Sequence, residues 1–313
     1  MLHESRHERL SQWSYVNVNA EPANTRSDPN LKSRVVALDQ EDACRLEAGK
    51  AGLTRTRDTL TRQEQMRALS LFQACCLAAT QATTSAERER AFERVYDEGR
   101  WVNGMDGALC SSGWSNVAAG QGASALQAVL KVVDTLDIRS IADIPSGDGC
   151  FAGALLRELR NRTAAAQAVT PPIEYVGVDI VARLVARNNA LYGDGSTQFL
   201  QADVVSGASP LPRADLIFSR QMLQHLCTDD ALRFVRMVAR SPARFALLTT
   251  FETDDAFVNS DIGCASGEYR PQDLTKPPFN LPTPIAQFSE QYPTDPRVSL
   301  GLWPVRMLRH RLL

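Results

Sequence analysis

The 313-residue sequence has few of the features that mark membrane or nucleic-acid-binding proteins. No apolar run approaches the roughly 20 residues that a membrane-spanning helix needs, and the polar first 30 residues contain no apolar core typical of a signal peptide. The 34 Lys and Arg residues nearly balance the 36 Asp and Glu residues, so the net charge of −2 gives no reason to expect a nucleic acid or an anionic membrane as partner. These absences predict a cytoplasmic globular protein, and they leave its oligomeric state open.

Cysteine and histidine are also scarce and scattered. The seven cysteines are odd in number and form no CxxC pair, which favours reduced thiols in a reducing compartment over a disulfide framework. The four histidines lack the spacing of metal ligands, so we expect no metal site. The cysteines are Cys44, Cys75, Cys76, Cys110, Cys150, Cys227 and Cys264.

The composition changes along the chain and predicts three parts. Residues 1–36 are polar with little periodicity and indicate a flexible or wrapping arm. Residues 37–122 indicate a helical extension whose last part is a loop rich in Gly, Ser and Trp. This loop is interpreted either as a lid or as a plug between the helices and a sheet. Residues 123–313 form the main domain.

Strand and helix patterns alternate within this main domain. The alternation predicts an α/β fold with a doubly wound, Rossmann-like and mostly parallel sheet of seven strands. A turn signal at 293–297 separates the last two strands and predicts that they form an antiparallel pair. The predicted strands are residues 139–144, 174–179, 197–202, 214–219, 244–250, 285–292 and 298–305, and the predicted helices are residues 123–136, 151–163, 182–192 and 228–240.

The most informative segment joins the first predicted strand to the helix after it. Asp143 ends the strand, and Gly147 and Gly149 form a tight turn before a helical pattern begins at Phe151. Glycines allow the backbone to approach a ligand closely, but a carboxylate ahead of them would repel a pyrophosphate. The arrangement therefore favours a cationic or zwitterionic adenosyl ligand with an amino-acid tail.

Polar residues also follow the next three strands, and the carboxyl ends of parallel strands meet at the ligand-binding edge of such a sheet. We expect Asp179 to accept two hydrogen bonds from a ribose and Asp203 to accept one from an adenine amino group. The predicted cofactor-binding residues are Asp143, Pro145, Gly147, Gly149, Asp179, Ile180, Ala202, Asp203, Val204, Ser219, Gln221 and Trp101.

A nicotinamide dinucleotide is the competing ligand, because residues 147–153 also read as GxGxxxG. Two details disfavour it. Asp143 places an acid before the glycines, and Asp179 lies 30 residues after Gly149, whereas a ribose-binding acid is expected about 20 residues on.

Over about residues 135–305 the chain resembles the class I S-adenosylmethionine-dependent methyltransferases. Segments 143–149, 175–179, 201–203 and 214–226 are similar to the first four motifs of that family, with Pro145 where a glycine is usual. Residues 101–115 and several segments between 259 and 303 also resemble a poorly characterised group of bacterial and algal methyltransferases, although Trp114-Ser115 replaces the usual Gly-Ser. The resemblance implies S-adenosylmethionine as cofactor, S-adenosylhomocysteine as product, and a small-molecule or glycan acceptor.

Methyl transfer requires alignment of the reactants, and an oxygen acceptor usually also needs a base. His225 follows the fourth strand and titrates near neutrality, so we expect it to be that base, with a core or capping imidazole as the alternative. The residues predicted to bind the acceptor substrate are Arg220, Asn259, Asp261, Tyr269 and Arg270.

These patterns predict an S-adenosylmethionine-dependent methyltransferase acting on an oxygen of a small molecule or sugar. Methylation of an amine or protein nitrogen, an NAD(P)-dependent oxidoreductase, and a catalytically silent methyltransferase-like binding subunit remain alternatives.

Overall fold

The computed structural model describes residues 83–101, 110–111, 121–165, 171–291 and 295–313. All of these belong to one unit, Thr83–Leu313. The predicted arm 1–36, most of the helical extension 37–122, and Cys44, Cys75 and Cys76 lie outside the described residues. The three-part division of the chain therefore stays a prediction.

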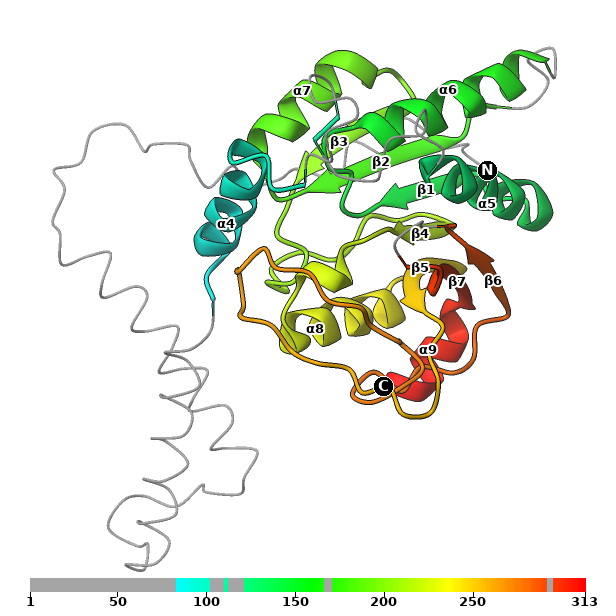
Figure 1. Ribbon diagram of the computed structural model, residues 1–313. Coiled ribbons are helices and arrows are strands. Elements are labelled where there is room, and N and C mark those ends of the chain that lie inside the picture. The colour runs from blue at the N-terminus through cyan, green and yellow to red at the C-terminus, as the bar shows by residue number, and fades with distance from the viewer. Residues whose placement is uncertain (1–82, 102–109, 112–120, 166–170, 292–294) are drawn as a thin grey trace, which may run out of the picture. The chain divides into compact units, whose positions relative to one another are not determined.

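Seven strands form one sheet in the order β3-β2-β1-β4-β5-β7-β6 (Figure 1). The strands from β3 to β5 pair in parallel, whereas β7 runs antiparallel to both β5 and β6. This arrangement confirms the predicted doubly wound, Rossmann-like sheet with a C-terminal antiparallel pair. The strands are β1 Ser140–Asp143, β2 Glu174–Asp179, β3 Thr197–Gln201, β4 Leu216–Ser219, β5 Phe245–Phe251, β6 Ala286–Ser289 and β7 Val298–Pro304.

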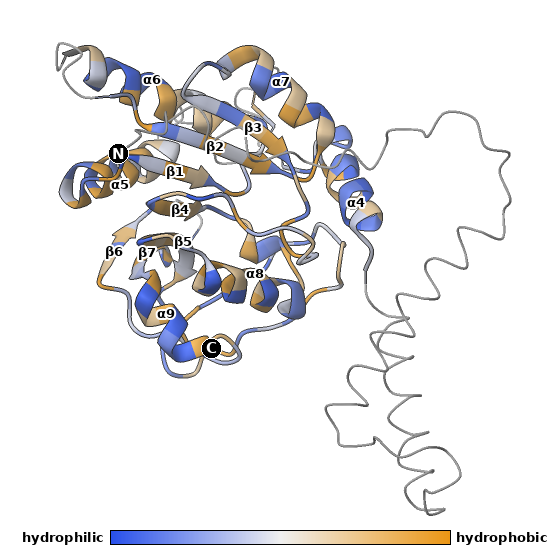
Figure 2. Ribbon diagram, turned by 180° about the vertical axis from the view of Figure 1, so that it is seen from behind, coloured by the Kyte–Doolittle hydropathy of each residue, from blue (hydrophilic) through white to orange (hydrophobic). Residues whose placement is uncertain are grey.

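Helices cover both faces of this sheet. Side chains of α5, α6 and α7 share one buried apolar cluster with the strands, and those of α8 and α9 share another. Figure 2 shows apolar colour along the central strands and mixed colour along the helices, as expected for helices with one face against a core. The helices are α4 Ser85–Asp97, α5 Gln121–Leu136, α6 Cys150–Ala165, α7 Ala182–Tyr192, α8 Thr228–Arg240 and α9 Val305–Leu312, with a 3₁₀ turn at Leu223–His225.

Local sequence explains where α4 begins. In α4 the Thr84 hydroxyl accepts from the Glu87 N–H at 3.2 Å, and the Glu87 carboxylate accepts from the Thr84 N–H at 2.8 Å. This reciprocal pair is a capping box, which satisfies N–H groups left unpaired at the first turn. The C-terminal helix α9 is not among the predicted elements. Its short buried stripe of Val305 and Leu308 follows β7 without a glycine break.

Four of the seven cysteines form disulfides, so the expectation of reduced thiols is wrong for these positions. Cys110 pairs with Cys150, and Cys227 pairs with Cys264. The partners are 40 and 37 residues apart in the sequence and form no motif, so only the tertiary structure brings them together. Because disulfides persist mainly in oxidising compartments, the predicted cytoplasmic location loses the support of its cysteine argument.

Among the residues that the structure describes, no helix has both the length and the apolar character needed to cross a bilayer.

We expect the double variant Cys227→Ser/Cys264→Ser to lower the free energy of unfolding by about 2–4 kcal/mol, because the bridge closes a long loop in the unfolded chain. Urea unfolding of the variant and of the wild type, each with and without reductant, measures this change. Reductant should destabilise the wild type. If instead all of the wild-type cysteines alkylate in denaturant without reductant, both bridges are absent.

Candidate cofactor and acceptor site

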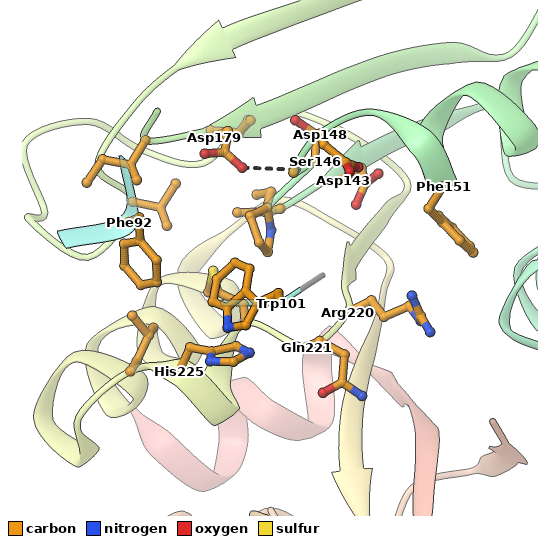
Figure 3. Close-up of a pocket in the computed structure, with 18 of the residues that line it drawn as sticks. Phe92, Trp101, Asp143, Ser146, Asp148, Phe151, Asp179, Arg220, Gln221 and His225 are labelled. Carbon is orange, nitrogen blue, oxygen red and sulfur yellow. Dashed lines mark hydrogen bonds between the residues drawn. The ribbon is translucent and has the colours of Figure 1, made fainter. Parts of the chain in front are cut away.

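A cavity of about 360 Å³ lies at the carboxyl ends of β1, β2 and β4 (Figure 3). This is the edge at which ligands bind in open parallel sheets, and the volume suits a small molecule. Every predicted cofactor-binding residue lines the cavity except Gly149 and Ser219. The fold therefore brings predicted residues that are up to 120 positions apart, from Trp101 to Gln221, to one cavity.

The turn between β1 and α6 depends on its glycines. Gly147 and Gly149 adopt positive φ values of 55° and 79°, which are strained for residues with a Cβ atom. A Cβ at Gly149 would also lie 2.3 Å from Oδ1 of Asn188. The Gly147 N–H donates to the Asp179 carboxylate at 2.9 Å, and this bond ties the turn to the end of β2.

Asp179 is buried and accepts hydrogen bonds on both carboxylate oxygens. Oδ2 accepts from the Gly147 N–H, and Oδ1 accepts from the Val181 N–H, each at 2.9 Å. Burial raises the pKa of Asp179 to about 6, although these N–H groups oppose the rise. A carboxylate oxygen has a second lone pair, so Asp179 retains the capacity to accept from ribose hydroxyls.

Asp143 is also buried and accepts a hydrogen bond from the Tyr175 hydroxyl. Burial raises the pKa of Asp143 to about 7, and the Tyr175 hydroxyl and Arg220 oppose this rise. Nearby Asp148, which sequence analysis did not select, also lines the cavity and accepts from the Ser111 N–H at 2.5 Å. Its position between the two glycines of the turn was the available signal.

These groups fit the adenosyl ligand that the sequence predicts. Asp143, Asp148 and Asp179 place three carboxyl groups in a cavity whose other walls are largely apolar. A ligand with a cationic centre offsets the cost of burying such charges, whereas a pyrophosphate adds to it. Ser146 Oγ and Gln221 Nε2 line the same cavity and are buried without a partner among the described residues, so a polar ligand can satisfy them.

Asp203 lines the cavity, but its carboxylate already has partners on α4. Oδ2 accepts from Ser85 Oγ at 2.5 Å and from Arg88 Nη2 at 2.8 Å. Arg88 also pairs with Asp230 at 3.2 Å, and all three charged side chains of this network are buried. The adenine role of Asp203 stays a prediction, but the structure gives this carboxylate a second task, which is to hold α4 at the edge of the cavity.

Helix α4 belongs to the predicted helical extension, and it contributes residues that the sequence analysis did not select. Arg88, Phe92 and Tyr96 all line the cavity. Their four-residue spacing places them on one helix face, and this spacing was the signal available in the sequence.

His225 lies at the opposite wall of the cavity, beside Trp101 (Figure 3). The centre of its ring lies 4.5 Å from that of Trp101 and 5.4 Å from that of Tyr269. His225 Nδ1 is 2.8 Å from the Glu268 carbonyl oxygen. Burial lowers the pKa of His225 to about 4, with a further lowering from Arg270, while the hydrogen bond to Glu268 opposes the shift.

Of the predicted acceptor-binding residues, Arg220 and Tyr269 line the cavity, whereas Asn259, Asp261 and Arg270 do not. These three instead hold the loop after β5. The Asn259 amide donates to the Asp273 carbonyl at 2.9 Å, and the buried Arg270 donates to the Ser260 carbonyl at 2.6 Å.

Asp261 accepts from the Thr228 N–H at 2.8 Å and so pairs an N–H group in the first turn of α8. Hydrogen-bonded turns make this loop an ordered part of the fold. The acceptor-binding role of Asn259, Asp261 and Arg270 stays a prediction that the lining of the cavity does not support.

Residues 147–243 match the sequence model of a family described as a methyltransferase domain. This segment is therefore similar to methyltransferase domains, as the sequence predicts. The seven-stranded sheet of Thr83–Leu313, with its reversed β7, is the arrangement that the resemblance to class I methyltransferases predicts, and a methyltransferase domain implies S-adenosylmethionine as cofactor. The nicotinamide alternative is thereby set aside. A search of curated proteins found no match.

The solved structures that match this chain include the 1,6-didemethyltoxoflavin-N1-methyltransferase of Burkholderia thailandensis. The two chains are 15% identical, the match covers 70% of this chain and 87% of that chain, and the TM-score is 0.46. The N-methyltransferase NodS of Bradyrhizobium japonicum, in complex with S-adenosylhomocysteine, shows 12% identity, coverage of 70% and 98%, and a TM-score of 0.47. At such identities and TM-scores, these likenesses do not decide the acceptor of this protein.

We expect Asp143→Asn to stabilise the cofactor-free protein more at pH 8 than at pH 5. The pKa of Asp143 is higher in the folded protein than in the unfolded chain, so its favourable contribution is complete below about pH 4 and is lost as the pH rises through about 7. Asn stays neutral at both pH values.

The stabilisation by Asp143→Asn relative to wild type should therefore grow by about 1–3 kcal/mol between pH 5 and pH 8. Urea unfolding at the two pH values measures it. A difference between variant and wild type that is the same at both pH values would show that Asp143 is ionised at an ordinary pKa.

Proposed function

We propose that this methyltransferase transfers the methyl group of S-adenosylmethionine to a hydroxyl oxygen of a small molecule or sugar, with His225 as the general base. The observation that carries the proposal is the hydrogen bond between His225 Nδ1 and the Glu268 carbonyl, on an imidazole that lines the cavity.

This bond determines which nitrogen of His225 can accept a proton. A carbonyl oxygen only accepts hydrogen bonds, so Nδ1 carries the proton and Nε2 retains a lone pair. The low pKa of His225 keeps the ring neutral near pH 7. A hydroxyl must lose its proton as it is methylated, whereas a neutral amine can react without a base. An oriented, neutral imidazole therefore supports oxygen as the acceptor atom.

The surroundings of His225 support an acceptor with a ring. Trp101 and Tyr269 both lie close to the imidazole and line the cavity, and either a phenol or the apolar face of a sugar can pack against aromatic rings of this kind. The cofactor supplies an already activated methyl group when bound. The residues of the chain then orient the acceptor and exclude water.

Incubation with carbon-13-methyl S-adenosylmethionine and a small-molecule extract tests the acceptor atom. The carbon-13 chemical shift of the transferred methyl distinguishes a methyl ether from a methylamine. A labelled methyl ether supports the proposal, and a labelled methylamine overturns it in favour of nitrogen. Bound cofactor without label in any metabolite would favour the silent binding subunit.

We expect His225→Asn to lower the turnover number by roughly 10²–10⁴-fold, the usual contribution of a general base. The Asn amide can still donate to the Glu268 carbonyl, so the local structure is retained while the basic nitrogen is lost. Calorimetry should show nearly unchanged affinity for S-adenosylhomocysteine. As a control, Asp179→Asn should weaken that affinity because Asp179 holds the glycine turn. Wild-type turnover in His225→Asn would remove His225 from the mechanism.

A further inference from the structure

Arg220 is a buried cation that follows β4 and lines the cavity. Its Nε donates to Glu290 Oε2 at 2.6 Å, and the two side chains are 5% and 0% exposed. The other oxygen of Glu290 accepts from Thr249 Oγ1 at 3.3 Å, so β5 also helps to fix the pair. The guanidinium of Arg220 is therefore held in one orientation.

The position of Arg220 places it at one end of the cavity. Its guanidinium carbon lies 5.3 Å from the centre of the Phe151 ring, on the first turn of α6. Figure 3 shows Arg220 and Phe151 on one side of the cavity, with Asp143 across from Arg220, whereas Phe92 lies at the far side. This end therefore combines the acidic glycine turn with a buried cation.

A second donor lies beside Arg220. Gln221 has a positive φ of 56°, and its N–H donates to Thr249 Oγ1 at 3.0 Å. Its side-chain nitrogen is buried without a partner among the described residues. Strained backbone at a cavity wall is held by its surroundings and is common at ligand sites. Two adjacent residues thus present hydrogen-bond donors where the glycine turn presents carboxyl groups.

This arrangement is complementary to a zwitterion. An ammonium group is favoured beside Asp143, and a carboxylate is favoured beside Arg220, because guanidinium binds carboxylates through several donors in one plane. An amino-acid tail carries both groups on one carbon atom. The acceptor role that the sequence indicated for Arg220 needs no such pairing of opposite charges.

We propose that Arg220, oriented by Glu290 and assisted by Gln221, binds the carboxylate of the cofactor's amino-acid end. The assignment rests on S-adenosylmethionine as cofactor and is independent of the oxygen acceptor proposed above. Glu290 does not line the cavity, so it acts as a positioning residue through Arg220.

Calorimetry with two probes isolates the carboxylate. S-adenosylhomocysteine and its decarboxylated analogue share the adenosyl and ammonium groups and differ only in that carboxylate. We expect the wild type to prefer S-adenosylhomocysteine by roughly 10- to 100-fold, as for a hydrogen-bonded charge pair. In Arg220→Gln/Glu290→Gln, which removes both buried charges together, the preference should fall to within about threefold.

Matched variants separate binding from folding. Asp179→Asn should lower the affinity for both probes equally and leave the ratio of the two affinities unchanged, because Asp179 is predicted to bind the ribose and not the carboxylate. Glu290→Gln alone should lower the ratio partly, and a loss of affinity at constant ratio would limit Glu290 to a structural role. If the double variant does not fold, Arg220→Lys replaces it, with an expected fall in the ratio of at least about threefold.

The proposal is overturned if the wild type binds both probes equally, or if the ratio in the folded Arg220 variant equals that of the wild type. If neither probe binds the wild type, the cofactor assignment itself fails, and this outcome is distinct from a failure at Arg220.

Discussion

The hydrogen bond from the Gly147 N–H to the Asp179 carboxylate is the constraint on which the site depends. It joins the turn after β1 to the end of β2, the strand that pairs with β1 along Ser140–Asp143. Parallel pairing brings the strand ends to one edge of the sheet. The turn itself needs positive φ values at Gly147 and Gly149, which are strained for any residue with a Cβ atom. With the turn fixed in this way, Asp143, Asp148 and Asp179 all line the same cavity.

The buried charges make this cavity costly in the absence of a ligand. Burial raises the pKa of Asp143 to about 7 and that of Asp179 to about 6, which means that the protein resists their ionisation. A cationic ligand reverses this preference by stabilising the carboxylates. The buried carboxyl groups thus lower the stability of the ligand-free protein and make the site selective for a sulfonium or ammonium group. At the same end of the cavity, Arg220 is a cation held by Glu290.

Two segments outside the sheet complete the architecture in different ways. Helix α4 is attached by the pairs of Arg88 with Asp203 and Asp230, and it contributes Phe92 and Tyr96 to the cavity wall. In the loop after β5, by contrast, polar side chains bond to the loop itself and to α8: Asn259 donates to the Asp273 and Pro277 carbonyls, and Asp261 accepts from the Thr228 N–H. A long loop near a site is therefore not by itself evidence of ligand contact, since hydrogen bonds within the loop can account for its polar residues.

The sequence by itself determined the alternation of strands and helices, the glycine turn and the acids at the strand ends, because each depends on neighbouring residues and on a regular period. It left undecided which distant side chains meet. From the sequence, Asp203 was predicted to accept a hydrogen bond from adenine. In the fold its carboxylate accepts from Arg88, which is 115 residues away in the sequence. Arg220 and Glu290 are 70 residues apart, and the disulfide partners are 40 and 37 apart. Such pairs leave no local periodicity, so only the packing of the sheet, its helices and its loops decides them.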